Sequence, residues 1–285
     1  MRTLVLFPGA LGDAICVEPA IRHLAQAGPV EFVARAGAAE VARLFPARPT
    51  LRSLDEARIG SLFAPMDSGA DAAPGWLDAY ERVVSFTGAN SSEFRARARA
   101  HRDARVVPFP ARDGADHAID LFAIAVGAGS GLVPRLAVRH GVRSGRSPRV
   151  LCVHPGASGA GKRFPVESWS SIIADARAAG FARIRVLLGP LEVAEVEIFR
   201  TLADEVVLPP DAAALADQLV DADAMVGCDS GPGHVAAALG RPTTILFRTT
   251  DARRFGPRGP RVRHLQVPSH DVVPDLRAWL AGLAG

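Results

Sequence analysis

One alternation repeats along almost the whole chain and restricts the folds open to it. A short apolar run is followed by a glycine-bearing turn and then by a run with apolar residues at helical spacing. The pattern forms two series, separated at residues 139–148 by the polar stretch RHGVRSGRSP. Strands that alternate with helices predict parallel sheets with helices on both faces. We therefore expect an α/β chain made of two doubly wound domains.

The two series assign most of the chain to elements. The first predicts strands at 3–7, 30–34, 82–86 and 105–109, and helices at 13–27, 38–45, 91–101 and 116–126. The second predicts strands at 150–153, 183–188, 224–227 and 243–247, and helices at 166–179, 192–203, 212–219 and 233–239. Residues 46–80 give no clear pattern. We assign residues 1–140 to the first domain, 149–268 to the second and 269–285 to a terminal amphipathic segment.

Composition and charge exclude several classes of protein. The 285 residues carry 33 basic and 30 acidic side chains, and a net charge of +3 does not indicate a dedicated nucleic-acid binder. The three cysteines lie far apart without a CxxC pair, which argues against a zinc site and suggests a reducing compartment. The apolar run at the N-terminus is too short for a secretory signal, and no stretch approaches transmembrane length. We expect a cytoplasmic protein.

The first motif is GALGD at residues 9–13, between the first strand and the first helix. Glycines allow a ligand to approach the backbone, and a helix N-terminus attracts anions. The spacing is not that of a dinucleotide-binding GxGxxG loop. Two interpretations of Asp13 stay open: a helix-capping acid in a tight turn, or a catalytic base. A carboxylate at a helix N-terminus tends toward a lower pKa, which weakens a base.

The second motif is the glycine-rich loop HPGASGAGKRFP at residues 154–165. It contains the only lysine of the chain, Lys162, beside Arg163. Backbone donors, a compact charge and a guanidinium fork suit a phosphate site. The loop is not a P-loop, because Arg163 stands where a hydroxyl residue should follow the lysine. The alternative is a mobile loop with solvated charges.

Two further motifs follow strands of the second series. DSGPGH at residues 229–234 opens a helix, so its serine, its backbone amides and its histidine predict an anion-binding end. The alternative is an ordinary capped helix, and a hydrolase elbow is excluded because Cys228 replaces the first glycine of GxSxG. Thr249, Thr250 and Asp251 could bind a sugar or form an ordinary exposed loop.

A basic run, RARARAHR, occupies residues 95–102. Arginines two residues apart point to different sides of a helix, so they do not form one basic face. We expect a solvated helix, and the alternative is a contact with an anionic acceptor or a lipid surface.

Three of these segments resemble glycosyltransferase family 9, the ADP-heptose:lipopolysaccharide heptosyltransferases. They read GALGDAICVEPAIRHL, HPGASGAGKRFPVESW and DSGPGHVAAALGRPTTILF. The resemblance implies a GT-B fold, in which two Rossmann-like doubly wound domains face each other across a cleft. The donor would lie mostly in the C-terminal domain and the acceptor in the N-terminal one. A terminal helix often crosses back to the first domain in such proteins, although residues 269–285 fit a packed surface helix equally well.

The resemblance also implies roles for single residues. Asp13 matches the catalytic aspartate, Lys162 the lysine that contacts donor phosphate, and Glu192 falls near the acid that holds the nucleoside ribose. The remaining donor-binding positions are Gly12, Ser158, Arg163, Asp229, Ser230, Gly231, Gly233, His234 and Thr250. Neither a metal nor a cofactor is expected. Phe164 replaces a tryptophan of the family, residues 248–252 depart from its GPTDP-like loop, and the match weakens after residue 46.

The function implied is an inverting, metal-independent glycosyltransferase. It would move a sugar, heptose from ADP-heptose, onto a saccharide or a lipid-linked acceptor of lipopolysaccharide synthesis, with Asp13 as base. The partners would be a nucleotide sugar and that acceptor, without nucleic acid, and with peripheral contact at the inner face of the inner membrane. The alternative is a catalytically degenerate GT-B protein that binds a nucleotide sugar or serves as a scaffold. Another sugar-nucleotide transferase or an epimerase of the same fold also stays open.

Overall fold

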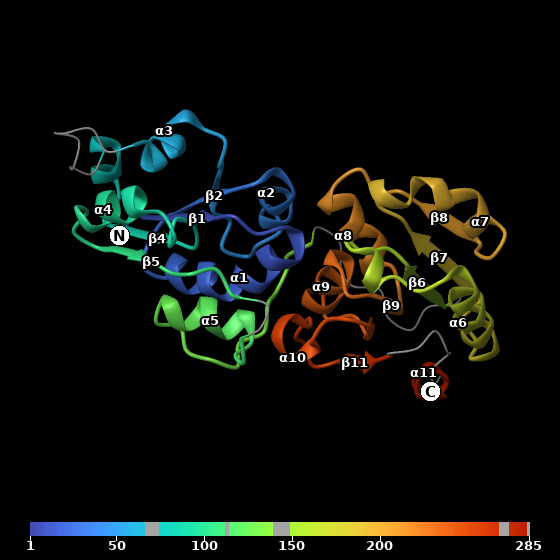
Figure 1. The fold of residues 1–285 in the computed structure, drawn as a ribbon. Helices are drawn as coiled ribbons and strands as arrows, with labels where there is room; N and C mark the ends of the chain where they lie inside the picture. The colour runs from blue at the N-terminus through green and yellow to red at the C-terminus, as the bar shows by residue number, and fades with distance from the viewer. Residues whose placement is uncertain (66–73, 112–113, 139–148, 268–273, 284–285) are drawn as a thin grey trace. The chain divides into compact units, whose positions relative to one another are not determined.

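The computed structural model describes residues 1–65, 74–111, 114–138, 149–267 and 274–283. The chain divides into two compact units, Met1–Ala137 and Val138–Gly285, which are coloured blue to green and yellow to red in Figure 1. The segment expected to link the domains, residues 139–148, lies outside the described residues, and the exact domain limits stay a prediction.

The first unit contains a parallel five-stranded sheet in the order β3-β2-β1-β4-β5. Its strands are β1 (Thr3–Phe7), β2 (Val30–Ala34), β3 (Thr50–Ser53), β4 (Arg82–Ser85) and β5 (Ala104–Val106). Every residue of β1 and β2 is buried, which agrees with their apolar runs. Sequence reasoning missed β3, because its TLRS segment lies at a sheet edge and is largely exposed.

Helices cover both faces of this sheet. Contacts join α1 (Leu11–Ala25) to α2 (Ala36–Ala42) and to α5 (Ala118–Ala125), and Phe7 of β1 packs edge-on against Phe122 of α5. Leu4 and Leu6, which alternate with Phe7, pack in the opposite layer. That layer contains α3 (Ala57–Gly60), α4 (Ser92–Arg99) and the 3₁₀ turns η1 (Ser61–Phe63) and η2 (Gly75–Ala79). Because successive side chains of a strand point to opposite faces of the sheet, β1 contributes apolar side chains to the layers on both faces.

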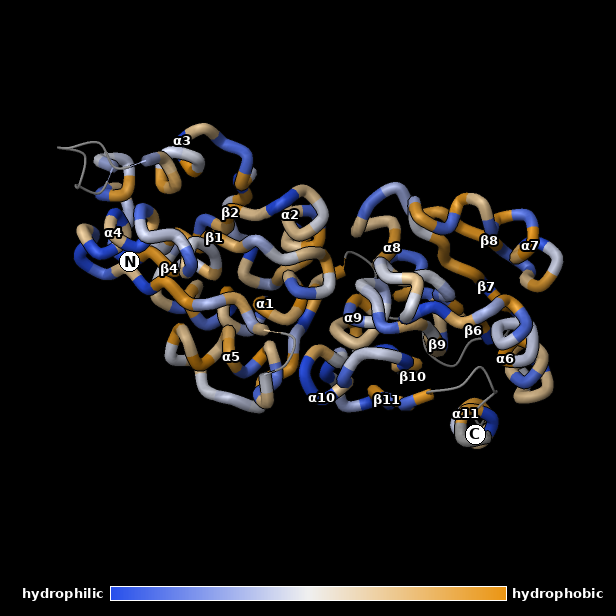
Figure 2. Tube along the Cα trace, viewed as in Figure 1, coloured by the Kyte–Doolittle hydropathy of each residue, from blue (hydrophilic) through white to orange (hydrophobic). Residues whose placement is uncertain are grey.

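The second unit contains a parallel six-stranded sheet in the order β11-β10-β9-β6-β7-β8. Its strands are β6 (Val150–His154), β7 (Arg183–Leu187), β8 (Glu205–Val207), β9 (Ala224–Cys228), β10 (Thr243–Phe247) and β11 (Val262–Gln266). The edge strands β8 and β11 were not predicted, because they are short or only partly buried. Hydrophobic residues recur along the strands and on the helices beside them in both units (Figure 2).

The helices of this unit are α6 to α11, with two 3₁₀ turns in the loops. Their bounds are η3 (Ala160–Lys162), α6 (Val166–Ala178), η4 (Pro190–Glu195), α7 (Val196–Arg200), α8 (Ala212–Val220), α9 (Gly231–Ala238), α10 (Ala252–Phe255) and α11 (Pro274–Gly282). The single helix predicted at 192–203 is wrong in form: the segment starts as 3₁₀ and continues as a shorter α-helix. Pro190, at the first position of η4, cannot donate a backbone hydrogen bond.

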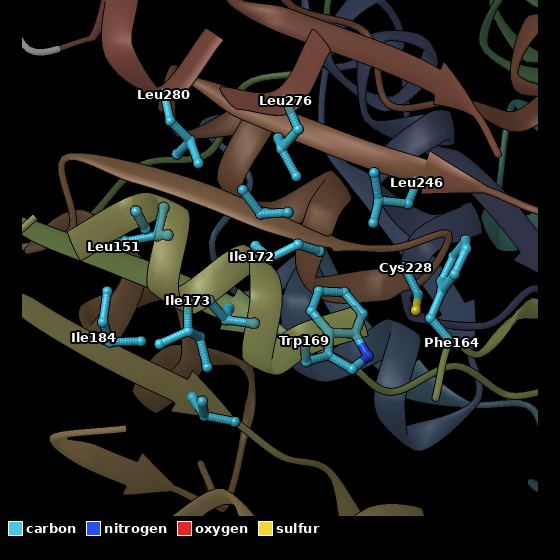
Figure 3. Close-up of a cluster of buried hydrophobic side chains, with 14 of the residues drawn as sticks. Leu151, Phe164, Trp169, Ile172, Ile173, Ile184, Cys228, Leu246, Leu276 and Leu280 are labelled. Atoms are coloured by element: carbon cyan, nitrogen blue, oxygen red, sulfur yellow. The ribbon is translucent and has the colours of Figure 1, made fainter. Parts of the chain in front are cut away.

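The terminal helix α11 packs on its own unit. Leu276 and Leu280 are buried in the same cluster as Ile172 and Trp169 of α6, as Figure 3 shows from the side of α6. Arg277 adds an ion pair with Asp175 of α6 at 2.7 Å. Of the two placements expected for this helix, the described contacts are those of a packed surface helix.

On α4, Arg95 and Arg99 are exposed as predicted for a solvated helix, whereas Arg97 departs from that prediction. Arg97 is only 5% exposed, and its guanidinium donates to the carbonyl oxygens of Leu62, Ala64 and Pro65. Those carbonyls lie at and after the end of η1, so Arg97 holds a chain segment and is not available to an anionic surface. Alternating charge along a helix did not reveal that one arginine turns inward.

Candidate active site

The predicted motifs of the second unit meet where the strand order of its sheet reverses. The order changes direction between β6 and β9, and the loops after these two strands carry the glycine-rich motif and the DSGPGH motif. Open parallel sheets bind ligands at this position, beyond the carboxyl ends of the strands. The sheet topology therefore explains why Lys162 and Asp229, which are 67 residues apart in sequence, lie in one cluster.

Lys162 bridges the two loops. Its Nζ lies 2.6 Å from Oδ2 of Asp229, and the same oxygen accepts the hydroxyl of Thr250 at 2.7 Å. Asp229 is 7% exposed at its side chain and Lys162 27%, so the cation stands on the outer side of the pair. The cluster joins the loops after β6, β9 and β10. A lysine in this position has further N–H groups for an anionic ligand.

Arg163 and Glu192 form a second pair beside the first. The Arg163 Nη2 lies 3.2 Å from Glu192 and 2.8 Å from Glu195. Glu192 is 4% exposed, and its Oε2 accepts the backbone N–H of Gly189 at 2.8 Å. Two hydrogen-bond donors, Gly189 and Arg163, therefore satisfy this buried carboxyl group. Glu195 was not predicted; its proximity to Arg163 depends on the turn η4.

Gly156 gives the Glu192 carboxyl the space it occupies. A Cβ atom built at Gly156 would lie 2.4 Å from Cδ of Glu192 and within 2.7 Å of both carboxyl oxygens. Any side chain at this position would collide with the carboxylate. The second glycine-rich motif therefore serves close packing of an acid against the backbone, in addition to any ligand.

Buried groups beneath the loops hold them to the sheet. His154 is 5% exposed, and its Nδ1 donates to the carbonyl of Leu187 at 2.8 Å, while burial lowers the pKa of its imidazole. The Cys228 thiol donates to the carbonyl of Pro155 at 3.1 Å, and burial raises its pKa to about 12. A thiol with such a pKa is an inert structural group at neutral pH.

Phe164 anchors the loop from the other side. Its ring lies edge-on to the fully buried indole of Trp169, with centroids 6.3 Å apart. The side chain is 7% exposed and belongs to the core cluster in Figure 3. Phe164 is therefore an aromatic anchor next to Lys162 and Arg163.

The N-terminal end of α9 lies at the same edge. Ser230 is the residue before the helix, and its hydroxyl donates to the carbonyl of Cys228 at 3.1 Å without capping the helix. Gly231 is the first helical residue, and His234 is buried in the first turn. A Cβ atom at Gly233 would lie 2.4 Å from Cδ1 of Ile245, so this glycine brings α9 close to β10. The alternative of an N-capped helix is not supported, since the serine points elsewhere.

Other predicted residues lie outside this cluster. Ser158 is exposed, and Asp251 caps α10 by accepting the N–H of Arg253 at 2.8 Å, as in an ordinary loop. Gly12 and Asp13 belong to the first unit, in the first turn of α1. The Asp13 Oδ2 accepts the N–H of Ala10 at 2.9 Å, so the carboxylate does cap its own helix. This capping accounts for its geometry and leaves its chemical role a prediction.

The described residues contain neither a metal-binding cluster nor a membrane-spanning helix. Within the described ranges, no group of three or more His, Cys, Asp or Glu side chains could hold a metal ion. Among the helices that the structure describes, none is long and apolar enough to cross a membrane.

The fold resembles several solved glycosyltransferases. The structure of ADP-heptose lipopolysaccharide heptosyltransferase II from E. coli has a TM-score of 0.72 and 19% identity, over 100% of this chain and 98% of that one. The E. coli heptosyltransferase WaaC with ADP has a TM-score of 0.69 and 17% identity, over 99% and 100%. A family 9 glycosyl transferase from Veillonella parvula has a TM-score of 0.71 and 17% identity, over 93% and 86%. These likenesses confirm the GT-B fold with two Rossmann-like sheets.

The sequence itself decides the family. A comparison with curated proteins gives no match. The model of glycosyltransferase family 9 (heptosyltransferase) matches residues 135–278, which is just over half of the chain and includes every motif of the second unit. The chain therefore belongs to glycosyltransferase family 9 and is a glycosyltransferase.

Proposed function

We propose that this enzyme transfers a heptose from ADP-heptose to a saccharide or lipid-linked acceptor, with inversion and without a metal. The Lys162–Asp229–Thr250 cluster at the reversal point of the second sheet is the observation that carries the proposal. Two of the similar structures support this donor, since E. coli WaaC is bound to ADP in one and to ADP-2-deoxy-2-fluoro heptose in the other. A lipid-linked acceptor would place the reaction at a membrane surface.

The donor diphosphate would lie between Lys162 and the N-terminal end of α9. Lys162 can keep Asp229 and use its other N–H groups for phosphate oxygens, and Thr250 can keep Asp229 in place. The helix end supplies backbone N–H groups and a positive dipole. Together these groups would stabilise the negative charge that develops on the leaving diphosphate.

The reaction would be a direct displacement at the anomeric carbon. A hydroxyl oxygen of the acceptor forms the new bond to this carbon as the bond to the diphosphate oxygen breaks. The proton of the hydroxyl goes to the carboxylate of Asp13, and the electron pair of the broken bond leaves with the nucleoside diphosphate. General-base help of this kind contributes about 10²–10⁴-fold to a rate.

Glu192 would hold the ribose of the nucleotide. Its two oxygens accept from Gly189 and Arg163, and a carboxylate has further lone pairs for ribose hydroxyls. Because the carboxyl is fixed against Gly156, its position does not depend on the ligand. A fixed acceptor of hydrogen bonds loses little entropy on binding.

Calorimetric titration tests the donor site. We expect ADP and ADP-heptose to bind more tightly than UDP or GDP, with and without Mg²⁺. Lys162→Ala should weaken ADP binding by roughly tenfold or more, since hydrogen bonds to charged groups contribute about 1.5–3 kcal/mol. Arg200→Ala is the matched control, because Arg200 is an exposed cation of the same unit paired with Glu197. Equal ADP affinity in wild type and Lys162→Ala would refute the site, and no binding of any nucleotide would favour a degenerate scaffold.

A further inference from the structure

The first unit ends in an irregular segment, residues 131–137, which we call the strap. The strap follows α5, a helix that packs beside α1 (Figure 1). Beyond Val138, the next described residue is Arg149, directly before β6 of the second unit. The strap is therefore the part of the first unit from which the chain leaves toward the second.

The two ends of the strap have exposed anchors. The N–H of Gly131 donates to Oδ1 of Asp120 in α5 at 2.8 Å. The N–H of Ala137 donates to the carbonyl of Leu44 at 2.7 Å. Gly131 and Ala137 are both exposed, so water competes for these bonds and each of them is a weak anchor.

The middle of the strap is held by α1 through a buried pair. Glu18 of α1 is fully buried, and its Oε1 accepts from Nε of Arg22 at 2.9 Å. The Oε2 of Glu18 accepts the backbone N–H of Arg135 at 2.9 Å. Arg22 in turn donates through Nη2 to the carbonyl of Val133 at 3.0 Å. Each member of the pair therefore binds one backbone group of the strap.

This central anchor is stronger than the anchors at the ends. Hydrogen bonds from a guanidinium are stronger than neutral ones, and a buried group that loses its partner finds no water to replace it. The strap is not part of a sheet, so side chains of α1 satisfy backbone groups that a strand ladder would otherwise satisfy. An apolar residue at position 18 would also be buried, but it would leave the N–H of Arg135 without this acceptor.

The helix that holds the strap also carries Asp13. Glu18 lies in the same uninterrupted helix, α1, which runs from Leu11 to Ala25. Transfer as proposed above needs Asp13 of the first unit and Lys162 of the second in one reaction. The point at which the chain leaves α1 therefore affects how well the base is aligned with the donor. Release of the strap would add roughly 20 Å of reach to the connecting chain, at about 3.3 Å per residue.

We propose that Glu18, together with Arg22, is a positioning residue that fixes the chain leading to the second unit onto the helix of the expected base. The inference rests on the proposed function and goes beyond the donor site, because it assigns a role in alignment without contact with substrate. While the strap is held, the chain leaves α1 at one place. When the strap is released, a smaller fraction of molecules has base and donor aligned, so kcat falls while the donor site is unchanged.

Glu18→Gln weakens the anchor with little change of shape. A glutamine has one acceptor oxygen and one NH₂ group, so one of the two donors at position 18 then faces another donor. Glu31→Gln is the matched control, because Glu31 is also a buried carboxyl group of the first unit. It accepts from Arg58 at 2.8 Å and from Arg2 at 3.1 Å. Arg58 belongs to α3 in the opposite layer, so the control disturbs a comparable pair away from the strap.

The variants are compared by pulsed EPR and by steady-state kinetics. Spin labels at Ile124→Cys and Ile198→Cys report the distance between the units, since both side chains are exposed and the three native cysteines are buried. We expect Glu18→Gln to broaden this distance distribution by up to about 20 Å. With ADP-heptose as donor and heptose-free lipopolysaccharide as acceptor, its kcat should fall about tenfold to a hundredfold. Its ADP affinity should stay at the wild-type value, and Glu31→Gln should match the wild type in all three measurements.

Several results would overturn the proposal. An unchanged distance distribution in Glu18→Gln would mean that the strap is held without this residue. Equal losses of kcat in Glu18→Gln and Glu31→Gln would mean a general effect of destabilising the first unit. A broadened distribution with the kcat of the wild type would mean that the exit of the chain does not affect alignment.

Arg22→Met gives an independent check. Because both residues act on one anchor, the double variant of Glu18→Gln and Arg22→Met should lose no more kcat than Arg22→Met alone. Losses that multiply would contradict a shared anchor. A wild type that transfers nothing from ADP-heptose, while Glu18→Gln still broadens the distance distribution, would refute the proposed function and leave the anchor in place.

Discussion

The packing of Gly156 against Glu192 gives a sharp test of how the glycine-rich loop is built. In a Gly156→Ala protein, the new Cβ would approach the Glu192 Cδ to 2.4 Å, which real contacts do not allow. The carboxyl group must then move. Movement breaks its bond from Gly189 N–H at 2.8 Å and its contact with Arg163 at 3.2 Å.

The cost follows from these two interactions. Hydrogen bonds to charged groups contribute about 1.5–3 kcal/mol each, so a displaced carboxylate should lower the free energy of unfolding by about 3 kcal/mol after partial relaxation. For a unit of roughly 150 residues this corresponds to a fall in Tm of about 6–12 °C. If Glu192 also holds the ribose, ADP affinity falls in the same variant.

Gly159→Ala is the matched control in the same loop. A Cβ atom at Gly159 meets no atom within 4 Å, and its φ of −125° suits any residue. This control should keep or raise stability by up to about 1 kcal/mol. Both proteins are compared by thermal and guanidinium unfolding and by ADP titration. Equal stability of the two variants would refute the reasoning from close packing, and a destabilised Gly156→Ala that binds ADP normally would refute only the ribose role.

Two further predictions concern Asp13 and His154. Asp13→Asn keeps an oxygen for the Ala10 N–H, so stability and ADP binding should hold while turnover falls about 10²–10⁴-fold; a steady-state assay with unchanged turnover would exclude the base role. Burial lowers the pKa of the His154 imidazole, so on acidification the unfolded chain binds this proton at a higher pH than the folded protein does. The contribution of His154 to stability is therefore complete above about pH 6.5. Below that pH the free energy of unfolding falls by up to about 1.4 kcal/mol per pH unit. His154→Gln should remove that slope in unfolding curves between pH 7 and 5, and an identical slope in both proteins would contradict the assignment.

Local pattern was sufficient for the main elements. β1, β2 and β10 have the bounds that their apolar runs predict, and α6 begins at the residue after Pro165 as expected. These elements are long or fully buried. Because buried positions are occupied mostly by apolar residues, their hydrophobic pattern is clear in the sequence. The edge strands β3, β8 and β11 carry a weaker signal, because an edge strand of three to five residues buries little.

The meeting of the three loops at one edge of the second sheet was partly foreseeable. Parallel strands gather the loops after them at one edge, so Lys162, Asp229 and Thr250 were expected near one another. Their actual linkage, with both Lys162 and Thr250 on one oxygen of Asp229, needed the side-chain geometry. Glu195 and His154 were missed as partners of this site. His154 is the last residue of a buried strand, in the segment HPG. Its position at the end of that strand was the sequence signal that could have identified it.

The sequence alone determined two parallel α/β sheets and the loops that carry their chemistry, because hydrophobic period and turn residues act over a few positions. Tertiary structure alone decided which polar groups are buried together. It turned Arg97 inward onto three carbonyls, fitted Glu192 against Gly156 and held residues 131–137 against Glu18 and Arg22. These features depend on strand order and on side-chain contacts between segments far apart in the chain. The local sequence pattern carries no information about either.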